Sequence, residues 1–276
     1  DNCAIYANAI FNDSANHDGS SLFLGAIFFT FQIYGDFSGY SDIALGTSRL
    51  FGIELLRNFA FPYFSRDIAE FWRRWHISLS TWFRDYLYFP LGGSQGGMWM
   101  KVRNTFAIFL VSGFWHGAIW TFIAWGFLNA LYFIPLLLLN KNRNHIETIS
   151  THAVLPSFKE FFQIMTTFFL TVIAWIFFRA DSLTHAFSIL KGIFSKSFFQ
   201  IPNFLGKHDL IYLLIHCSMI GVLLVIEWLH RDKQFGLQFN ATMLQSKYKR
   251  WILYTVLVLF ILLFGGKQNN FIYFQF

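Results

Sequence analysis

The chain has 276 residues, of which 55% are hydrophobic, 21% aromatic and only 13% charged. A soluble domain carries about 25% charged residues, so this chain has too little charge to cover a water-soluble globule. The composition excludes a disordered chain, a coiled coil and a small disulfide scaffold, and it indicates a multi-spanning membrane protein. The formal net charge is +6. Because the basic residues lie between long apolar runs, we assign them to membrane topology and not to nucleic-acid binding.

Cysteine usage and the start of the chain add little. The two cysteines, Cys3 and Cys217, cannot build a disulfide framework, and the chain has neither a CxxC pair nor the Cys/His spacing of a zinc site. We therefore expect no metal centre. The chain starts at Asp1 without a basic-then-apolar signal peptide, which indicates a processed product or a fragment of a longer protein.

The first long apolar stretch covers residues 22–50 and becomes polar after residue 31. Four residues recur at spacings of four, three and four and so share one helical face: Gly35, Gly39, Asp42 and Gly46. Glycines on such a face let a second helix approach closely. We expect Asp36 and Asp42 either to pair with arginines beside a packing seam or to line a polar cavity, because carboxylates within a membrane are costly and need partners.

The next segment mixes basic and aromatic residues. Ser65 is placed to cap a helix. An apolar stripe follows at spacings of four and three, formed by Ile68, Trp72, Trp75, Leu79, Trp82 and Tyr86. The stripe predicts one amphipathic helix at the membrane interface, with Glu70 and Arg74 paired one turn apart. His76 lies at the edge of the stripe, and it is either an ordinary interfacial histidine or a polar group brought to the mouth of a site.

Basic residues are concentrated around this expected helix. Residues 49–103 contain eight of them, which places the region on the cytoplasmic side of a membrane. The run PLGGSQGG at 90–97 lacks the lysine and Ser/Thr of a phosphate-binding P-loop. It is either a turn or a loop that touches a ligand.

The longest uncharged run covers residues 104–139 and exceeds the roughly 20 residues that cross a bilayer. It is therefore one tilted helix or two pieces, and Gly113 and Gly117 mark the expected break. His116 is the only histidine in the run. Burial disfavours the imidazolium, so we expect a neutral ring with a basic nitrogen and, beside the glycines, room for a substrate. A buried histidine that only hydrogen-bonds a carbonyl is the alternative reading.

Further spans are expected at 161–178, 210–229 and 251–265. His216 lies in the second of these without neighbouring glycines or an aromatic cluster, so we expect it to bond across helices. Arg179 and Asp181 are expected to pair at a membrane boundary. The sequence thus predicts an all-α, multi-pass transmembrane protein with an interfacial amphipathic helix and a long or broken central helix.

Several of these stretches, taken together, resemble the membrane-bound O-acyltransferase family and, within it, the alginate O-acetylation proteins. In the family's order they are QIYGDFSGYSDIALG (32–46), FWRRWHISLSTWFRDYLYFPLGG (71–93), VSGFWHGAIWTFIAWG (111–126), AWIFFRADSL (174–183) and FIYFQF (271–276). Family members are longer at the N-terminus. We therefore expect residues 1–276 to form a single membrane-embedded acyltransferase domain that lacks N-terminal spans.

The resemblance implies a catalytic histidine in the Trp-His-Gly motif, which is His116, and a second functional histidine in the Arg-Arg-Trp-His motif, which is His76. Members of the family move an acyl group, usually acetyl from acetyl-CoA, to hydroxyls of an extracytoplasmic glycan or to a partner transferase. Related D-alanyl transfer proteins use a carrier-bound thioester. The resemblance also implies the bacterial inner membrane as location, with no bound cofactor.

These assignments fit the chemistry of acyl transfer. A neutral imidazole can take the hydroxyl proton as general base, which typically contributes about 10²–10⁴-fold. Arg73 and Arg74 are expected to attract the phosphates of coenzyme A. The residues expected to line or brace the site are Asp36, Asp42, Trp115 and Gly117.

Two other classes of protein compete with this hypothesis. A transporter or channel also places histidine and aspartate among apolar helices, but it should show repeated halves or paired broken helices, and this sequence shows neither. A catalytically inactive membrane scaffold for a cell-surface glycan acetylation complex is the other alternative.

Overall fold

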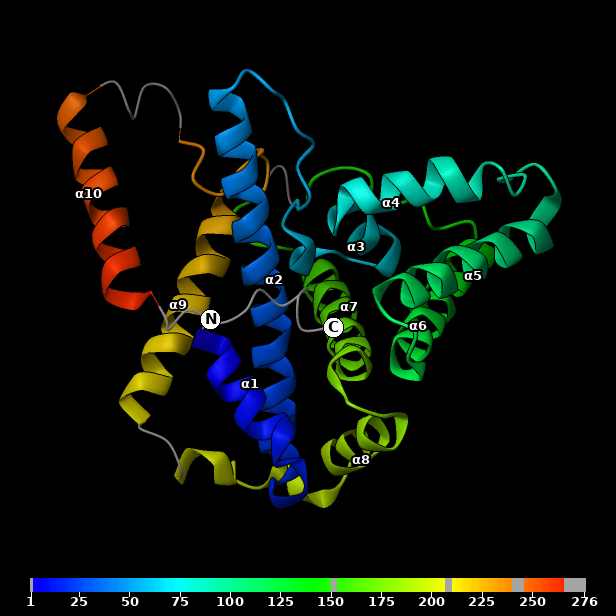
Figure 1. Cartoon of the computed structure of the whole chain (residues 1–276), viewed down its shortest axis with the longest axis horizontal. Coiled ribbons are helices and arrows are strands. Elements are labelled where there is room, and N and C mark those ends of the chain that lie inside the picture. The colour runs from blue at the N-terminus through cyan, green and yellow to red at the C-terminus, as the bar shows by residue number, and fades with distance from the viewer. Residues whose placement is uncertain (1, 150–152, 207–209, 240–245, 266–276) are drawn as a thin grey trace.

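The computed structural model describes residues 2–149, 153–206, 210–239 and 246–265, and in this part of the chain the regular elements are all helices (Figure 1). The α-helices are α1 Asn2–Asn12, α2 Gly19–Leu50, α3 Ile68–Arg74, α4 Ile77–Phe83, α5 Gly97–His116, α6 Trp120–Leu138, α7 Phe158–Arg179, α8 Leu183–Ile193, α9 Leu210–Leu229 and α10 Lys247–Phe264. The all-α prediction is confirmed. The FIYFQF segment at 271–276 lies outside the described residues.

The long helix α2 runs through the middle of the molecule, with α1, α7 and α8 packed against it (Figure 1). Its start is fixed by Asp18, whose side chain accepts hydrogen bonds from the Ser21 N–H (2.9 Å) and from the Asn203 N–H (2.8 Å). This N-cap satisfies one of the backbone donors that a helix start leaves free. In Figure 1, α5 and α6 lie together on one side of α2, and α10 lies on the other.

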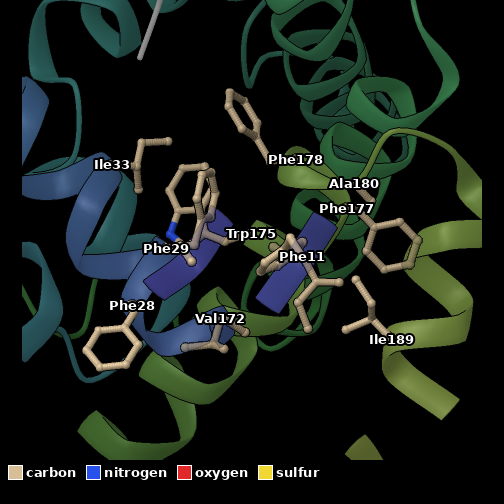
Figure 2. Close-up of a cluster of buried hydrophobic side chains, with 14 of the residues drawn as sticks. Phe11, Phe28, Phe29, Ile33, Val172, Trp175, Phe177, Phe178, Ala180 and Ile189 are labelled. Atoms are coloured by element: carbon tan, nitrogen blue, oxygen red, sulfur yellow. The ribbon is translucent and has the colours of Figure 1, made fainter. Parts of the chain in front are cut away.

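The core between these helices is largely aromatic. Phe28 and Phe29 of α2 and Trp175 of α7 are buried in it (Figure 2). Two consecutive residues of α7 point to different neighbours. Phe177 contacts Phe187 of α8, whereas Phe178 points in another direction, away from Phe177 (Figure 2). Phe178 therefore lies on the side of α7 that faces α5 and α6.

Three helices of the described chain are long and apolar enough to cross a membrane, namely α6, α7 and α9. The expected spans at 161–178 and 210–229 and part of the 104–139 run are thus confirmed as membrane-length helices. The fourth, at 251–265, forms α10 but does not meet the same criterion, since α10 begins with Lys247, Lys249 and Arg250. The protein is a membrane protein with helices on both sides of α2.

The helix predicted over 65–86 is wrong as a single element. It is two short helices, α3 and α4, and Trp75 and His76 between them are not helical. Its cap is also different, because the Asp67 side chain, and not Ser65, accepts from the Glu70 N–H at 2.7 Å. The expected Glu70–Arg74 pair is confirmed at 2.7 Å. A stripe of apolar residues cannot reveal such a break, because the spacing continues across it.

The break predicted in the 104–139 run is confirmed at Gly117. Helix α5 ends at His116, Gly117 is extended, and α6 begins at Trp120. The two helices form a close hairpin: a Cβ added to Gly113 would lie 2.4 Å from the Phe122 carbonyl oxygen. Backbone contact of this kind is what small residues permit between helices in a membrane.

Candidate active site

His76 lies at the corner between α3 and α4, in the left-handed backbone region with φ 45° and ψ 55°. That conformation costs a non-glycine residue roughly 1–2 kcal/mol, so the surrounding structure must hold it. The segment before α3 does this. The Asn58 carbonyl accepts from the Ile77 N–H at 3.0 Å, and the Asn58 side chain accepts from the Ser78 N–H at 3.2 Å and from its hydroxyl at 2.6 Å.

Asn58 was not among the candidate residues from the sequence. Its side-chain amide also donates to the Ser41 hydroxyl on α2 at 3.3 Å, so it ties the polar part of α2 to the histidine corner. The only signal in the sequence is a lone amide in an aromatic segment. Its partners are 17 and 20 residues away along the chain, too distant for local spacing to suggest them.

His116 lies at the other corner, where α5 ends. Its ring is surrounded by aromatic side chains, with ring centroids at 5.1 Å for Trp115, 5.2 Å for Phe178 and 5.4 Å for Trp125. All three meet the histidine ring edge to face. The Phe178 ring is the one that the core directs away from α8 (Figure 2).

The two histidines line the same cavity, of about 770 Å³, which we call the histidine cavity. They approach it from different elements and are joined through indole rings. Trp75, next to His76, packs against Trp175 at 5.1 Å, and Trp175 stacks on Trp125 at 5.8 Å. Helix α7 thus separates and positions the corners that carry the two imidazoles.

The histidine cavity is lined by positively charged side chains. Four cationic side chains line it, and none of the described residues that line it is acidic; the four are Arg73, Arg84, Lys101 and Arg143. Arg73 is held by the carbonyls of Asn142 and His145, each at 2.8 Å, which fixes the loop after α6 over the cavity. A cavity with this charge attracts an anionic ligand such as a phosphate.

Burial keeps His76 uncharged. Desolvation lowers the pKa of His76 from its usual 6.5 to about 4, because an imidazolium loses solvation in a low-dielectric site. Its Nδ1 atom is buried and has no hydrogen-bond partner among the described residues. At neutral pH the ring is therefore a neutral group, able to donate one hydrogen bond and accept another.

The expectation that glycines clear space for a substrate beside His116 is wrong for Gly113, because Phe122 of α6 fills the space beside it, whereas Gly117 also lines a cavity. A Cβ on Gly113 would meet the Phe122 backbone, and a Cβ on Gly117 would lie 2.5 Å from the Phe122 ring. The glycines make room for α6. The cavity that Gly117 lines, of about 460 Å³, is the Gly117 cavity, which has Phe178 in common with the histidine cavity.

The two arginines expected to bind phosphates, Arg73 and Arg74, lie in different environments. Arg73 lines the histidine cavity, but Arg74 does not: it donates to the Glu70 carboxylate at 2.7 Å and to the Ala60 carbonyl at 3.1 Å. Glu70 is 1% exposed and also binds Arg66 at 3.1 Å. Arg74 is therefore part of a buried ionic network, and its assignment to a donor site is wrong.

Of the four residues expected to support the site, the two aspartates lie apart from the two histidines. Asp36 lines a third cavity of about 580 Å³ between α1, α2 and α9, the lateral cavity. Asp42 is exposed and lines none of these three cavities. Trp115 is 56% exposed and touches the His116 ring without lining the histidine cavity. Of the four, only Gly117 and Trp115 adjoin His116.

His216 bonds across helices, as expected. Its Nδ1 atom is 2.8 Å from the Tyr6 hydroxyl of α1. Arg179 and Asp181 also approach each other, at 3.9 Å, and Arg179 donates to Asn8 at 3.0 Å. The Tyr6–His216 contact holds α1 against α9, and the Arg179–Asn8 contact holds α1 against α7.

The fold and site together define a membrane-embedded helical protein with two histidines in one basic cavity. The model of the membrane-bound O-acyltransferase family matches residues 17–178, which include both histidines and the Trp175–Phe178 wall. The chain belongs to the membrane-bound O-acyltransferase family.

Individual relatives support the same family. The chain is 32% identical over its whole length to a peptidoglycan O-acetyltransferase of Helicobacter pylori and covers 53% of that protein. It is 39% identical over 81% of its length to a probable alginate O-acetylase, AlgI, of Pseudomonas aeruginosa, covering 40% of it. A teichoic acid D-alanyltransferase of Streptococcus thermophilus is 41% identical over 39% of the chain. The chain spans about half, or less, of the length of these relatives.

Proposed function

We propose that the protein transfers an acyl group, acetyl from acetyl-CoA, to a hydroxyl of an extracytoplasmic polysaccharide or of a partner transferase in the bacterial inner membrane. The observation that carries the proposal is the convergence of His76 and His116 on one cavity with four cationic side chains and no carboxylate among its described lining residues. The names of the relatives support a polysaccharide acceptor and an acyl donor.

In this mechanism His116 is the general base. The acceptor oxygen attacks the thioester carbonyl while the His116 imidazole takes the hydroxyl proton. The tetrahedral intermediate collapses, the carbon–sulfur bond breaks, and the proton passes to the departing thiolate, giving the ester and free coenzyme A. The neutral His76 ring donates its single N–H to the carbonyl oxygen, where negative charge develops.

The cationic side chains bind the donor. Lys101 and Arg143 line the histidine cavity and form no ion pair with any described residue, so their charges are available to phosphates. Arg73 adds a third charge while it holds the 140–146 loop. We place this side of the molecule in the cytoplasm, in agreement with the basic residues of 49–103.

The test compares His116→Ala with the matched change His216→Ala in the full-length protein in membranes, supplied with acetyl-labelled acetyl-CoA. We expect His116→Ala to lower both release of free coenzyme A and labelling of the glycan by about 10²–10⁴-fold. His216→Ala should stay within about threefold of the wild type, because His216 lies in the lateral cavity. Both variants must accumulate and unfold like the wild type.

The competing functions give different outcomes in the same assay. Undiminished glycan labelling by His116→Ala would favour a scaffold for another enzyme. Passage of intact acetyl-CoA across the membrane without free coenzyme A would favour a transporter. Either result would overturn the proposal.

A further inference from the structure

One buried polar side chain of α2 has no part in the mechanism above. Gln32 is 5% exposed, and its Oε1 atom is buried without a hydrogen-bond partner among the described residues. Its neighbours along α2 include Phe28, Phe29 and Phe31, all buried. A buried polar group without a partner loses roughly 1–3 kcal/mol relative to one that is paired, so such a group in an aromatic environment calls for an explanation.

Gln32 lies in the wall between two cavities. It lines the Gly117 cavity, together with Phe29, Gly117 and Phe178, and it also lines the lateral cavity. Phe178 in turn lines the histidine cavity, and its ring is 5.2 Å from that of His116. Phe122 also lines the Gly117 cavity, and its ring is 6.3 Å from that of His116, so the rings of Phe178 and Phe122 lie between this cavity and the reacting histidine. Figure 2 shows Phe178 pointing away from Phe177.

The other polar groups of the Gly117 cavity are already engaged. Arg179 donates to Asn8 and Asn12 of α1 and is 3.9 Å from Asp181. Gln32 is thus the polar side chain of this cavity with unused hydrogen-bonding capacity. A primary amide offers one acceptor oxygen and two N–H donors, and rotation of the amide exchanges their positions. This capacity matches an alcohol, which donates one hydrogen bond and accepts others.

We propose that Gln32 binds the acyl acceptor, with its amide hydrogen-bonded to a hydroxyl of a sugar that enters through the Gly117 cavity. The inference rests on the proposed function and adds the acceptor side of the site, opposite the cationic donor side. A neutral amide suits a polyol, because it imposes no charge on the ligand. Gln32 holds one hydroxyl of the sugar in the Gly117 cavity, on the side of α2, while His116 takes the proton of another hydroxyl in the histidine cavity, on the side of α5.

The experiment replaces Gln32 with Met, which has similar length and no hydrogen-bonding amide, in the full-length protein. Gln163→Met is the matched control, since Gln163 is a half-buried glutamine of α7 that lines none of the three cavities. The acceptor is surface polysaccharide from the source cells, treated with alkali to remove its O-acetyl groups. Two rates are measured with acetyl-CoA: glycan acetylation as a function of polysaccharide concentration, and release of coenzyme A without polysaccharide.

We expect Gln32→Met to raise the KM for polysaccharide about fivefold to tenfold, as for loss of one hydrogen bond. Release of coenzyme A to water should stay within about twofold of the wild type. The unfolding temperature should be unchanged or higher, because the variant removes an unpaired buried amide. Gln163→Met should leave both rates unchanged.

Three results would overturn the inference. An unchanged KM would show that Gln32 does not touch the acceptor. A lower unfolding temperature with equal loss of both rates would make Gln32 a structural residue. If the wild type does not acetylate the polysaccharide, or if His116→Ala keeps the wild-type rate of acetylation, the proposed function fails and the role of Gln32 fails with it.

Discussion

Glycine and histidine lie close together in two regions of this molecule, and the two regions are built differently. In the α5–α6 hairpin, Gly113 and Gly126 bring the helix backbones into contact, and His116 closes the hairpin against an aromatic wall. On α2, Gly35 faces open space, and His216 across the lateral cavity is held by a tyrosine hydroxyl. The same residue types therefore mark the corner that we propose to be catalytic in one region and an open helix face in the other. Small residues permit close approach, but a partner helix must be present to use it.

Replacing one glycine of each region with alanine should give the largest difference in the free energy of unfolding. Gly126→Ala places a Cβ 2.3 Å from the Phe109 carbonyl oxygen, a backbone atom that cannot rotate away. We expect a loss of about 2–3 kcal/mol, or roughly 5–10 °C in unfolding temperature. Gly39→Ala meets nothing within 4 Å and should be neutral or slightly stabilising, as alanine favours a helix.

Thermal unfolding of both variants in detergent measures this difference. Gly113→Ala is a second hairpin variant and should behave like Gly126→Ala. A comparable loss of stability for Gly39→Ala would break the comparison, because it would show that the α2 face has a partner other than the described residues.

Acid should affect the histidine region through His76. Burial lowers the pKa of His76 to about 4, so between about pH 6.5 and pH 4 the unfolded chain binds a proton that the folded chain does not. Stability linked to His76 is thus fully present above pH 6.5 and is lost as the pH falls toward 4. Activity that requires the neutral ring should hold down to about pH 5.

The measurement is the unfolding temperature between pH 4 and pH 8 for the wild type and His76→Asn. Asparagine tolerates the left-handed backbone but does not titrate. We expect the acid-induced decline to become shallower in the variant. Identical slopes would mean that His76 is solvated and that the histidine cavity is no drier than the surface.

The smallest expected effect concerns donor binding. Lys101→Gln removes a charge from the histidine cavity and should raise the apparent KM for acetyl-CoA about threefold to tenfold, more at low salt. Asp36→Asn, in the lateral cavity, should leave it unchanged. Lys141→Gln is the matched control, since Lys141 is exposed and lines none of the three cavities. Equal shifts for Lys101 and Lys141 would indicate general charge attraction without a donor site.

Local signals predicted a large part of this molecule. Apolar run lengths predicted the spans in α6, α7 and α9, and Gly117 marked the end of α5, because these features depend on residues close in sequence. The spacing of Glu70 and Arg74 predicted their ion pair. It could not show that Glu70 is buried or that only Arg73 of the two arginines lines the histidine cavity, because both depend on packing between distant segments.

The break between α3 and α4 at His76 also could not be predicted from residues close in sequence. The apolar stripe continues through it, and the break is held by Asn58, whose hydrogen bonds reach across the chain. The role of the glycines was misjudged for a related reason: sequence shows where a side chain is missing, whereas only the structure shows which atoms fill the space. At His116 those atoms belong to Phe122.

The left-handed backbone of His76 has a consequence for engineering. Glycine adopts this conformation freely, and it would also remove an unpaired buried nitrogen. A selection for heat resistance alone would therefore favour variants that lose the His76 ring. Under the proposed mechanism these most stable variants would be inactive.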